Sequence, residues 1–348
     1  MRTFLILALA LIAGSALAEQ PVRPFVPVFE TDFADAFILR HNSEFLGYAT
    51  NAQGDKANVP MARSANLVDW QTIQNGKQLH DAMPVLPPWA RAGLTWAPEV
   101  IKTATGYVLT FTARDRRSEL QCIGAAFSRD PLGPFVSAAT QPLVCQTELG
   151  GTIDSHAFRA ADGALYLYFK SDANNPKFGK KTDIFVQRLS PDALSVMGAA
   201  AALVRNDAAW EAHVIEAPTM VRHGPSYFLF FSANHYGWET HQKLSPYAIG
   251  YARCSGPMGP CIDAPENPIL HSYKDRQAGC LSGPGHQSIF EVGGRQFISF
   301  HAWAATRGCR KFDNRRYLYI APLLWEGGTP KIGNSLRPRQ VPLTARAQ

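Results

Sequence analysis

Runs of apolar and aromatic residues recur along this chain at a spacing of about sixty residues. In the clearest run, residues 226–232 (SYFLFFS), apolar side chains occupy both sets of alternating positions, which is typical of a strand buried on both faces. The five runs align, at separations of 62, 59, 61 and 70 residues, on Phe45, Tyr107, Tyr166, Tyr227 and Phe297. A long period with several strands per unit predicts a stacked array, and five units suit a closed ring. We therefore expect an all-β fold, a five-bladed β-propeller forming a single catalytic domain.

A polar residue precedes each of these strands by 8 to 12 positions. The five are Asp35, Glu99, Asp154, Glu216 and His286. In a propeller the first strand of each blade runs along the central channel, so equivalent positions in different blades face one another. Each carboxylate costs several kcal/mol to bury unless it is paired. Four acids and a histidine at one mouth of the channel therefore indicate a working site.

The N-terminus has the features of a secretory signal peptide. Residues 1–18 contain Arg2, an apolar run and a small-x-small ending, Ala16-Leu17-Ala18. The apolar run is too short to span a bilayer, and no second one follows. We expect a secreted protein without a membrane span, whose propeller domain occupies residues 19–348.

Composition adds little to this picture. Charged residues make up 18% of the chain and aromatic residues 11%, which suits a β-rich body with short turns. The pI is about 9.0, but lysine and arginine are scattered, so nucleic-acid binding is not expected. The sequence does not predict an oligomeric state.

Six cysteines in an exported chain are expected to form disulfides. Fifteen connectivities exist, and pairing between sequence neighbours is favoured. The favoured pairs are Cys122–Cys145, Cys254–Cys261 and Cys280–Cys309.

The segments around the five polar residues resemble a known family. They read FADAFILR, WAPEVI, GGTIDSHAF, VIEAPTMV and GPGHQSIF. In this order and spacing, over about Phe29 to Pro330, they resemble the inner-strand motifs of glycoside hydrolase family 43. The resemblance implies a five-bladed propeller that cleaves arabinose- or xylose-containing polymers with inversion of configuration. It implies no cofactor for catalysis and a carbohydrate as partner.

The resemblance also assigns roles to three carboxylates. Asp35 matches the general base, Asp154 the acid that orients and tunes, and Glu216 the general acid. One departure is Ala36, which stands where the family usually has proline; it removes local rigidity but leaves the carboxylate. Asp32 is a nearby competitor, but only Asp35 leads directly into the apolar FILR strand.

Inverting hydrolysis explains the need for several acids. One carboxyl protonates the leaving oxygen and another activates a water that must fit between them. The acid has to remain protonated near neutral pH. The neighbours of Glu216 are apolar (Val214, Ile215, Ala217 and Pro218), so we expect burial and the charge of Asp154 to raise its pKa.

Substrate contacts are expected from Trp96, Trp238, Trp303 and His286. Trp96 can stack on a pentose ring, although core packing is an equal alternative. The other two tryptophans are expected in loops after the strands. His286 resembles the family's channel histidine, near which some members hold a water-coordinated calcium ion. A hydrogen-bonded core histidine is the alternative.

Three further residues complete the expected site. Glu99 is expected either to lie behind the residues that contact substrate or to pair with an arginine. His301 is expected in a loop, and Arg316 is expected to reach an acid or a sugar hydroxyl.

Among the activities that the resemblance allows, we expect an α-L-arabinofuranosidase. β-Xylosidase, endo-arabinanase and a non-catalytic sugar-binding propeller are the alternatives. Well-developed stretches at 172–181 and 235–246 favour an exo-acting pocket. The histidines show no HxxxH or HxH spacing and the chain has no GxSxG, which argues against a metallohydrolase and a serine hydrolase.

Overall fold

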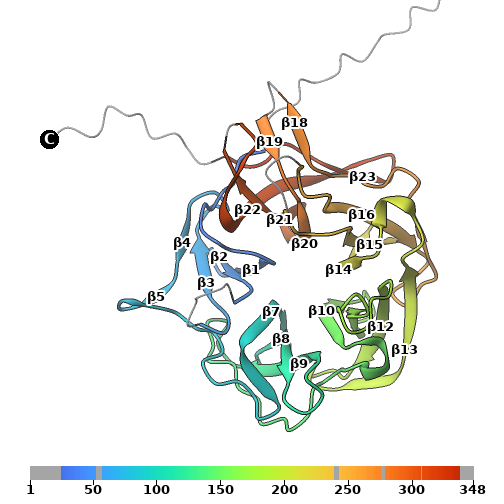
Figure 1. Cartoon of the computed structure of the whole chain (residues 1–348). Coiled ribbons are helices and arrows are strands. Elements are labelled where there is room, and N and C mark those ends of the chain that lie inside the picture. Colours follow the sequence, from blue (N-terminus) through green and yellow to red (C-terminus); the bar gives the residue numbers. More distant parts are fainter. Residues whose placement is uncertain (1–24, 52–56, 239–242, 276–278, 307, 338–348) are drawn as a thin grey trace, which may run out of the picture.

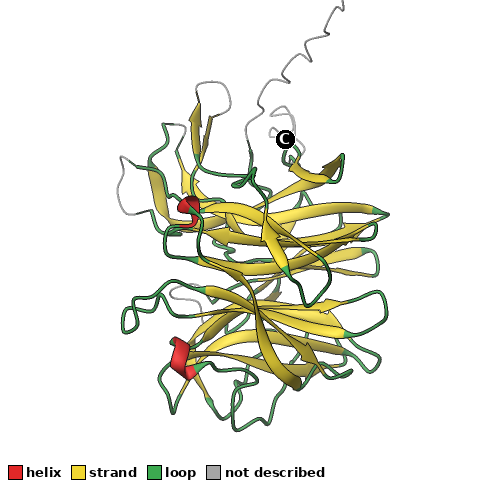
Figure 2. Ribbon diagram, turned by 90° about the vertical axis from the view of Figure 1, so that its right-hand side faces the viewer, coloured by secondary structure: helices red, strands yellow, loops and turns green. Residues whose placement is uncertain are grey.

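A computed structural model describes residues 25–51, 57–238, 243–275, 279–306 and 308–337. Five antiparallel sheets surround a central channel, as the sequence predicts (Figure 1). Seen from the side, most strands run roughly along the direction of the channel (Figure 2). The signal peptide predicted at 1–18 lies outside the described residues. No described helix is long or apolar enough to cross a membrane.

The strands of each blade follow one another in sequence from the channel outwards. Blade 1 contains β1 (Phe37–His41), β2 (Glu44–Tyr48), β3 (Met61–Ser64) and β4 (Trp70–Thr72). Blade 2 contains β7 (Ala90–Lys102), β8 (Tyr107–Asp115) and β9 (Gln121–Ser128). Blade 3 contains β10 (Thr152–Arg159), β11 (Leu165–Ser171), β12 (Asp183–Leu189) and β13 (Val196–Arg205). Blade 4 contains β14 (Ile215–His223), β15 (Ser226–Ala233), β16 (Ala248–Cys254) and β17 (Cys261–Asp263). Blade 5 contains β20 (Gly285–Val292), β21 (Arg295–Ala305), β22 (Lys311–Glu326) and β23 (Thr329–Ile332).

Small elements fill the connections. The two hairpins are β5 (Gln74–Asn75) with β6 (Gln78–Leu79), and β18 (Tyr273–Asp275) with β19 (Gly279–Leu281). The two 3-10 turns are η1 (Thr147–Leu149) and η2 (Ala209–Glu211).

The aromatic runs form the second strands of the blades, β2, β8, β11, β15 and β21. Apolar clusters fill every interface between neighbouring blades. Phe231 of β15, for example, packs toward blade 3, whereas Phe230 packs toward blade 5. Both faces of these strands are therefore buried, which explains why their sequences lack a polar face.

The ring closes through the N-terminal segment. Val28 donates its amide to the carbonyl of Leu318 in β22 at 2.9 Å, and Phe33 donates to the carbonyl of Arg316 at 2.9 Å. Blade 5 therefore holds the chain just before Asp35, which fixes the entry to blade 1.

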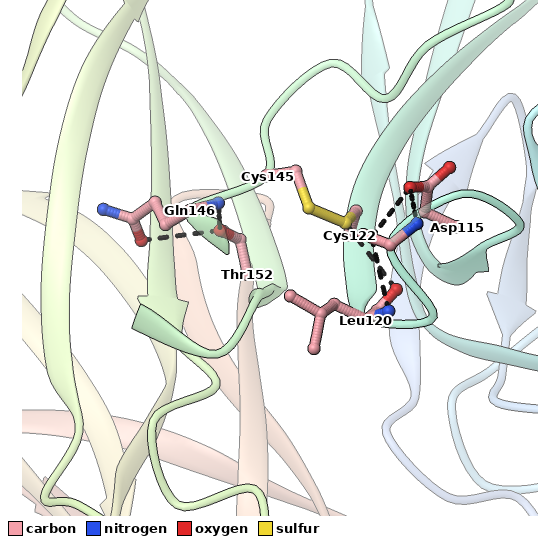
Figure 3. The surroundings of a disulfide bond; sticks show 7 residues. Asp115, Leu120, Cys122, Cys145, Gln146 and Thr152 are labelled. Carbon is pink, nitrogen blue, oxygen red and sulfur yellow. Dashed lines mark hydrogen bonds between the residues drawn. A yellow bond between two sulfur atoms is a disulfide. The ribbon is translucent and has the colours of Figure 1, made fainter. Parts of the chain in front are cut away.

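All three predicted disulfides are present. Cys122, in β9, is bonded to Cys145 (Figure 3). The next residue, Gln146, donates its amide to Oγ1 of Thr152, the first residue of β10, at 2.8 Å. The bond thus anchors the approach to the strand that carries Asp154.

Candidate active site

Each inner strand contains, or is directly preceded by, one non-glycine residue in the left-handed region. These residues have φ between 44° and 58°, and they are Asp35, Ala97, Asp154, Ala217 and His286. In blades 2 to 5 the pairing register shifts at this point. Left-handed non-glycine residues are strained and gather at functional sites. A bulge of this kind re-aims a side chain. In blade 1 the left-handed residue, Asp35, lies two residues before β1 and causes no register shift; we call the left-handed residue the bulge position in every blade.

The preceding blade holds each bulge through one side chain at the end of its second strand. The amides of Ala97, Asp154 and His286 donate to the hydroxyls of Thr50 (3.0 Å), Thr112 (3.2 Å) and Ser232 (2.8 Å). The amide of Asp35 faces Nδ1 of His301 at 3.2 Å. We call this second-strand position the bulge-holding position.

Blade 3 has Lys170 at the bulge-holding position, paired in register with Ile153 just before Asp154. An ammonium cannot accept a hydrogen bond. The amide of Ala217 donates instead to Oδ2 of Asp154 at 3.1 Å. Nζ of Lys170 lies 3.0 Å from Oε2 of Glu216.

The expectation that the five polar residues are equivalent is only partly right. Asp35, Asp154 and His286 occupy the bulge, whereas Glu216 precedes it by one residue and Glu99 follows it by two. Glu99 therefore pairs with His156, the corresponding residue of the next blade, at 2.8 Å. Of the two arrangements expected for Glu99, the pairing with an arginine is wrong, because its partner is a histidine.

Asp35 is surrounded by cationic and hydrogen-bonding groups. Its Oδ1 lies 3.2 Å from Nη1 of Arg316, 3.3 Å from Nδ1 of His286 and 3.1 Å from Nδ1 of His301. The hydroxyl of Thr50 donates to Oδ2. Burial alone would raise the pKa of Asp35, but Arg316 and the two histidines hold it well below its usual value. Asp35 is therefore a carboxylate throughout the neutral range.

The same neighbours explain the residues that sequence left unplaced. His301 lies in β21 and not in a loop, and burial with the charge of Arg316 lowers its pKa to about 4. Oδ1 of Asp32 accepts the amide of Arg316 at 2.8 Å, so it fixes the backbone beneath that side chain.

Glu216 has two partners that the sequence did not reveal. Lys170 contacts Oε2, and the hydroxyl of Tyr247 donates to Oε1 at 2.7 Å. Burial raises the pKa of Glu216, but Lys170, Tyr247 and His286 together bring it below the ordinary value. The expectation of a raised pKa is wrong because it considered only the apolar neighbours in sequence.

Asp154 shows the opposite shift. Burial is the largest influence: together with the negative charges of Glu216 and Asp35 it outweighs the lowering by His286 and Lys170, so the pKa of Asp154 is raised to about 7. As the pH falls through about 7, Asp154 therefore takes up a proton before Glu216 does. Burial lowers the pKa of His286, but the three carboxylates raise it above its usual value.

The predicted tryptophans differ in position. Trp96 is half-buried in β7, directly before a bulge, as Glu216 is in β14. The expectation of a loop position is wrong for Trp303, which is buried in β21, where its Nε1 donates to the carbonyl of Tyr236 at 2.7 Å. Trp238 is buried two residues after that tyrosine. The rings of Trp303 and Tyr236 lie 6.0 and 5.5 Å from the guanidinium of Arg316. Their substrate contacts stay predictions.

A calcium ion at His286 also stays a prediction. Calcium prefers oxygen ligands, and Nδ1 of His286 already faces Asp35. Within the described ranges, His286 belongs to no group of three candidate ligands whose atoms lie within 4.8 Å of one another. These residues do not fit direct coordination of the ion by the ring, and an ion there would be held through water.

Comparisons with known proteins agree with this geometry. The model of the glycosyl hydrolases family 43 matches residues 25–330. A crystal structure described as a thermostable family-43 glycoside hydrolase superimposes with a TM-score of 0.75 at 30% identity, covering 91% of this chain and 98% of that one. An extracellular endo-α-(1→5)-L-arabinanase 2 of Bacillus subtilis is 22% identical over 88% of this chain and 72% of its own length. An extracellular exo-α-(1→5)-L-arabinofuranosidase, ArbA, of Cellvibrio japonicus is 23% identical over 71% of this chain and 74% of its own.

Proposed function

Because the chain belongs to glycosyl hydrolases family 43 and is a glycoside hydrolase, we propose that it is a secreted, exo-acting α-L-arabinofuranosidase. The observation that carries the proposal is the convergence of three carboxylates, from blades 1, 3 and 4, on His286. The coarser assignment is a hydrolase of arabinan, arabinosides or xylan. No cofactor is proposed for the reaction.

Asp35 is the proposed general base. Its carboxylate stays ionised beside Arg316, so it can take a proton from the water that attacks the anomeric carbon. The guanidinium of Arg316 also disfavours protonation of Asp35 before substrate binds. Blades 1 and 4 supply the base and the acid from different inner strands, and an inverting reaction requires that the two carboxyls leave space for that water.

Glu216 is the proposed general acid, and its surroundings favour giving up a proton. Once the proton has moved to the glycosidic oxygen, Lys170 and Tyr247 stabilise the carboxylate that remains. The same contacts lower the fraction of Glu216 that is protonated beforehand.

Two features support a closed, exo-acting pocket. In the stretch 172–181, Oδ1 of Asn174 accepts a hydrogen bond from Nζ of Lys170 at 2.9 Å. Tyr247, which contacts Glu216, follows directly after the stretch 235–246, of which residues 239–242 lie outside the described ranges. Each stretch therefore contacts or directly precedes a residue, Lys170 or Tyr247, that is bonded to Glu216. The similarity to an exo-acting arabinofuranosidase points the same way.

The test compares 4-nitrophenyl α-L-arabinofuranoside, 4-nitrophenyl β-D-xyloside and linear arabinan as substrates of the purified protein. We expect cleavage of the arabinofuranoside and release of free arabinose from arabinan without intermediate oligosaccharides. Preference for the xyloside would make the protein a β-xylosidase, and a rapid fall in arabinan viscosity would make it an endo-arabinanase. Either result would overturn the exo-arabinofuranosidase assignment.

Glu216→Ala tests the acid separately. We expect loss of arabinan cleavage by about 100-fold or more, with a much smaller loss on an aryl glycoside whose leaving group needs little protonation. Equal losses on both substrates would argue for a structural role.

A further inference from the structure

Three acidic side chains meet at the outer seam between blades 3 and 4, away from the channel. Asp207 and Glu211 belong to the connection from β13 to β14, and Asp263 ends β17. One candidate ligand atom from each lies within 4.8 Å of the others. The neighbouring cations are engaged elsewhere: Arg205 pairs with Asp183 at 3.7 Å, and Lys181 donates to the carbonyl of Asn206 at 3.1 Å.

Two of these carboxylates have buried oxygens that receive no hydrogen bond within the described part of the chain. Glu211 is 0% exposed; its Oε2 accepts the amides of Asp207 (2.9 Å) and Ala208 (3.0 Å), but its Oε1 has no donor. Oδ1 of Asp263 is also buried without a donor. The side-chain amide of Asn206, which is 5% exposed, has no partner at either atom. Glu211 and Asp263 are close enough to hydrogen-bond to each other when one of them is protonated. When both are ionised, their buried oxygens need a counter-charge.

We propose that Asp207, Glu211 and Asp263 bind a divalent cation of the calcium type. All three donors are hard oxygens, and the group contains no histidine or cysteine, which favours calcium over zinc or copper. Asp207 is exposed, so the site opens to solvent on one side and water can complete the coordination shell. The carbonyl oxygen of the neighbouring Asn206 side chain is a further candidate ligand.

The competing explanation is a proton shared between Glu211 and Asp263. Burial and the nearby charge of Asp263 raise the pKa of Glu211 to about 7, although the amides of Ala208 and Asp207 oppose this shift. A cation and a proton would therefore compete for the same oxygens.

A cation here would brace the approach to the proposed acid. The carbonyl of Glu211 accepts the amide of Val214 at 3.1 Å, and the carbonyl of Val214 accepts the amide of Asn234 at 2.9 Å. The side-chain amide of Asn234 donates a hydrogen bond to the carbonyl of Trp210 at 3.2 Å. Glu216 follows two residues after Val214. The site is thus expected to stabilise this corner of blade 4 without taking part in the reaction.

The test measures the melting temperature of chelator-treated protein with and without calcium, at a pH above 7. At a free calcium concentration about 100-fold above the dissociation constant, we expect Tm to rise by about 4 °C. Glu211→Gln should abolish this rise, because it removes the charge but keeps an oxygen for the two amides. Glu148→Gln is the matched control, since Glu148 is exposed in the other 3-10 turn, and it should retain the rise.

A second readout keeps the test decisive if Glu211→Gln folds poorly. Terbium should show luminescence excited through the adjacent Trp210, calcium should displace it, and Asp207→Asn at the exposed edge should weaken both effects. An equal Tm rise in wild type and Glu211→Gln would overturn the site. If calcium leaves the Tm of the wild type unchanged, and this Tm rises as the pH falls through about 7, Glu211 and Asp263 share a proton and do not bind a cation.

Discussion

Replacing Lys170 by methionine tests how the site sets the acidity of Glu216. Lys170 is 1% exposed, and its Nζ lies 3.0 Å from Glu216 and 3.8 Å from Asp172. Methionine has a similar length and no charge. Without the ammonium, burial becomes the dominant influence on Glu216, so its pKa should rise. A general acid works only while protonated, and the alkaline limb of the kcat/KM profile should therefore move to higher pH.

The size of this effect follows from the contact distance. At an effective dielectric constant of about 20, unit charges 3.0 Å apart interact by about 5.5 kcal/mol, which is an upper bound of roughly 4 pH units. A single adjacent opposite charge usually changes a pKa by about 1–3. We expect the limb to move upward by about 1–3 pH units. The weaker acid should also lower kcat more on a natural linkage than on an activated aryl glycoside.

The assay is kcat/KM against pH on an unactivated arabinoside. Lys331→Met is the matched control, because Lys331 forms an exposed pair with Glu326 at 2.6 Å on β23. The control should leave the limb where it is in wild type. A Lys170→Met limb that is unmoved or lower, in a protein with normal Tm, would refute the coupling between this ammonium and the acid.

Two further substitutions separate the other carboxylates. Asp35→Asn should lower activity on every substrate by about 100-fold or more. Added azide should restore turnover by forming the glycosyl azide of inverted configuration. A variant that keeps a tenth of the wild-type rate would show that another residue is the base. Asp154→Asn removes a carboxyl whose own pKa is raised to about 7, so a limb of the kcat/KM profile near pH 7 that reports its titration should be lost. A lower rate with an unmoved limb would make Asp154 a positioning residue only.

The five-bladed ring was predictable from the sequence because the residues of the second strands show how the blades pack. Second strands such as β15 are apolar on both faces, since each blade packs against two neighbours. The cysteine pairs were predictable because each lies within a short stretch of one or two blades.

The residue at which each inner strand bulges was not predictable from the sequence. One residue decides whether a side chain enters a bulge, and a distance of 8 to 12 residues to the next aromatic strand is too loose to fix it. Glu216 and Ala217 differ by that single residue, as do Trp96 and Ala97. Each bulge depends on a hydrogen bond from another blade, for which the local sequence carries no signal.

The acidity of Glu216 was mispredicted for a related reason. Its partners, Lys170 and Tyr247, lie 46 and 31 residues away in the chain. Lys170 ends the apolar run LYLYFK, where a sequence reading finds only the edge of a strand. The contact with Lys170 joins two neighbouring blades, and the contact with Tyr247 is made by the folding of blade 4, so neither arises from a local sequence pattern.

The bulge-holding positions show how a symmetric ring yields an asymmetric site. Three of the five are hydroxyl residues, Thr50, Thr112 and Ser232, which accept the next blade's amide. The other two are Lys170 and His301, and each reaches forward to a carboxylate of the next blade, Glu216 or Asp35. The proposed acid and base are therefore the two carboxylates beside which the repeat departs from a hydroxyl. Because Lys170 cannot accept the amide of Ala217, Asp154 must do so, and one departure from the repeat accounts for the positions of two acids.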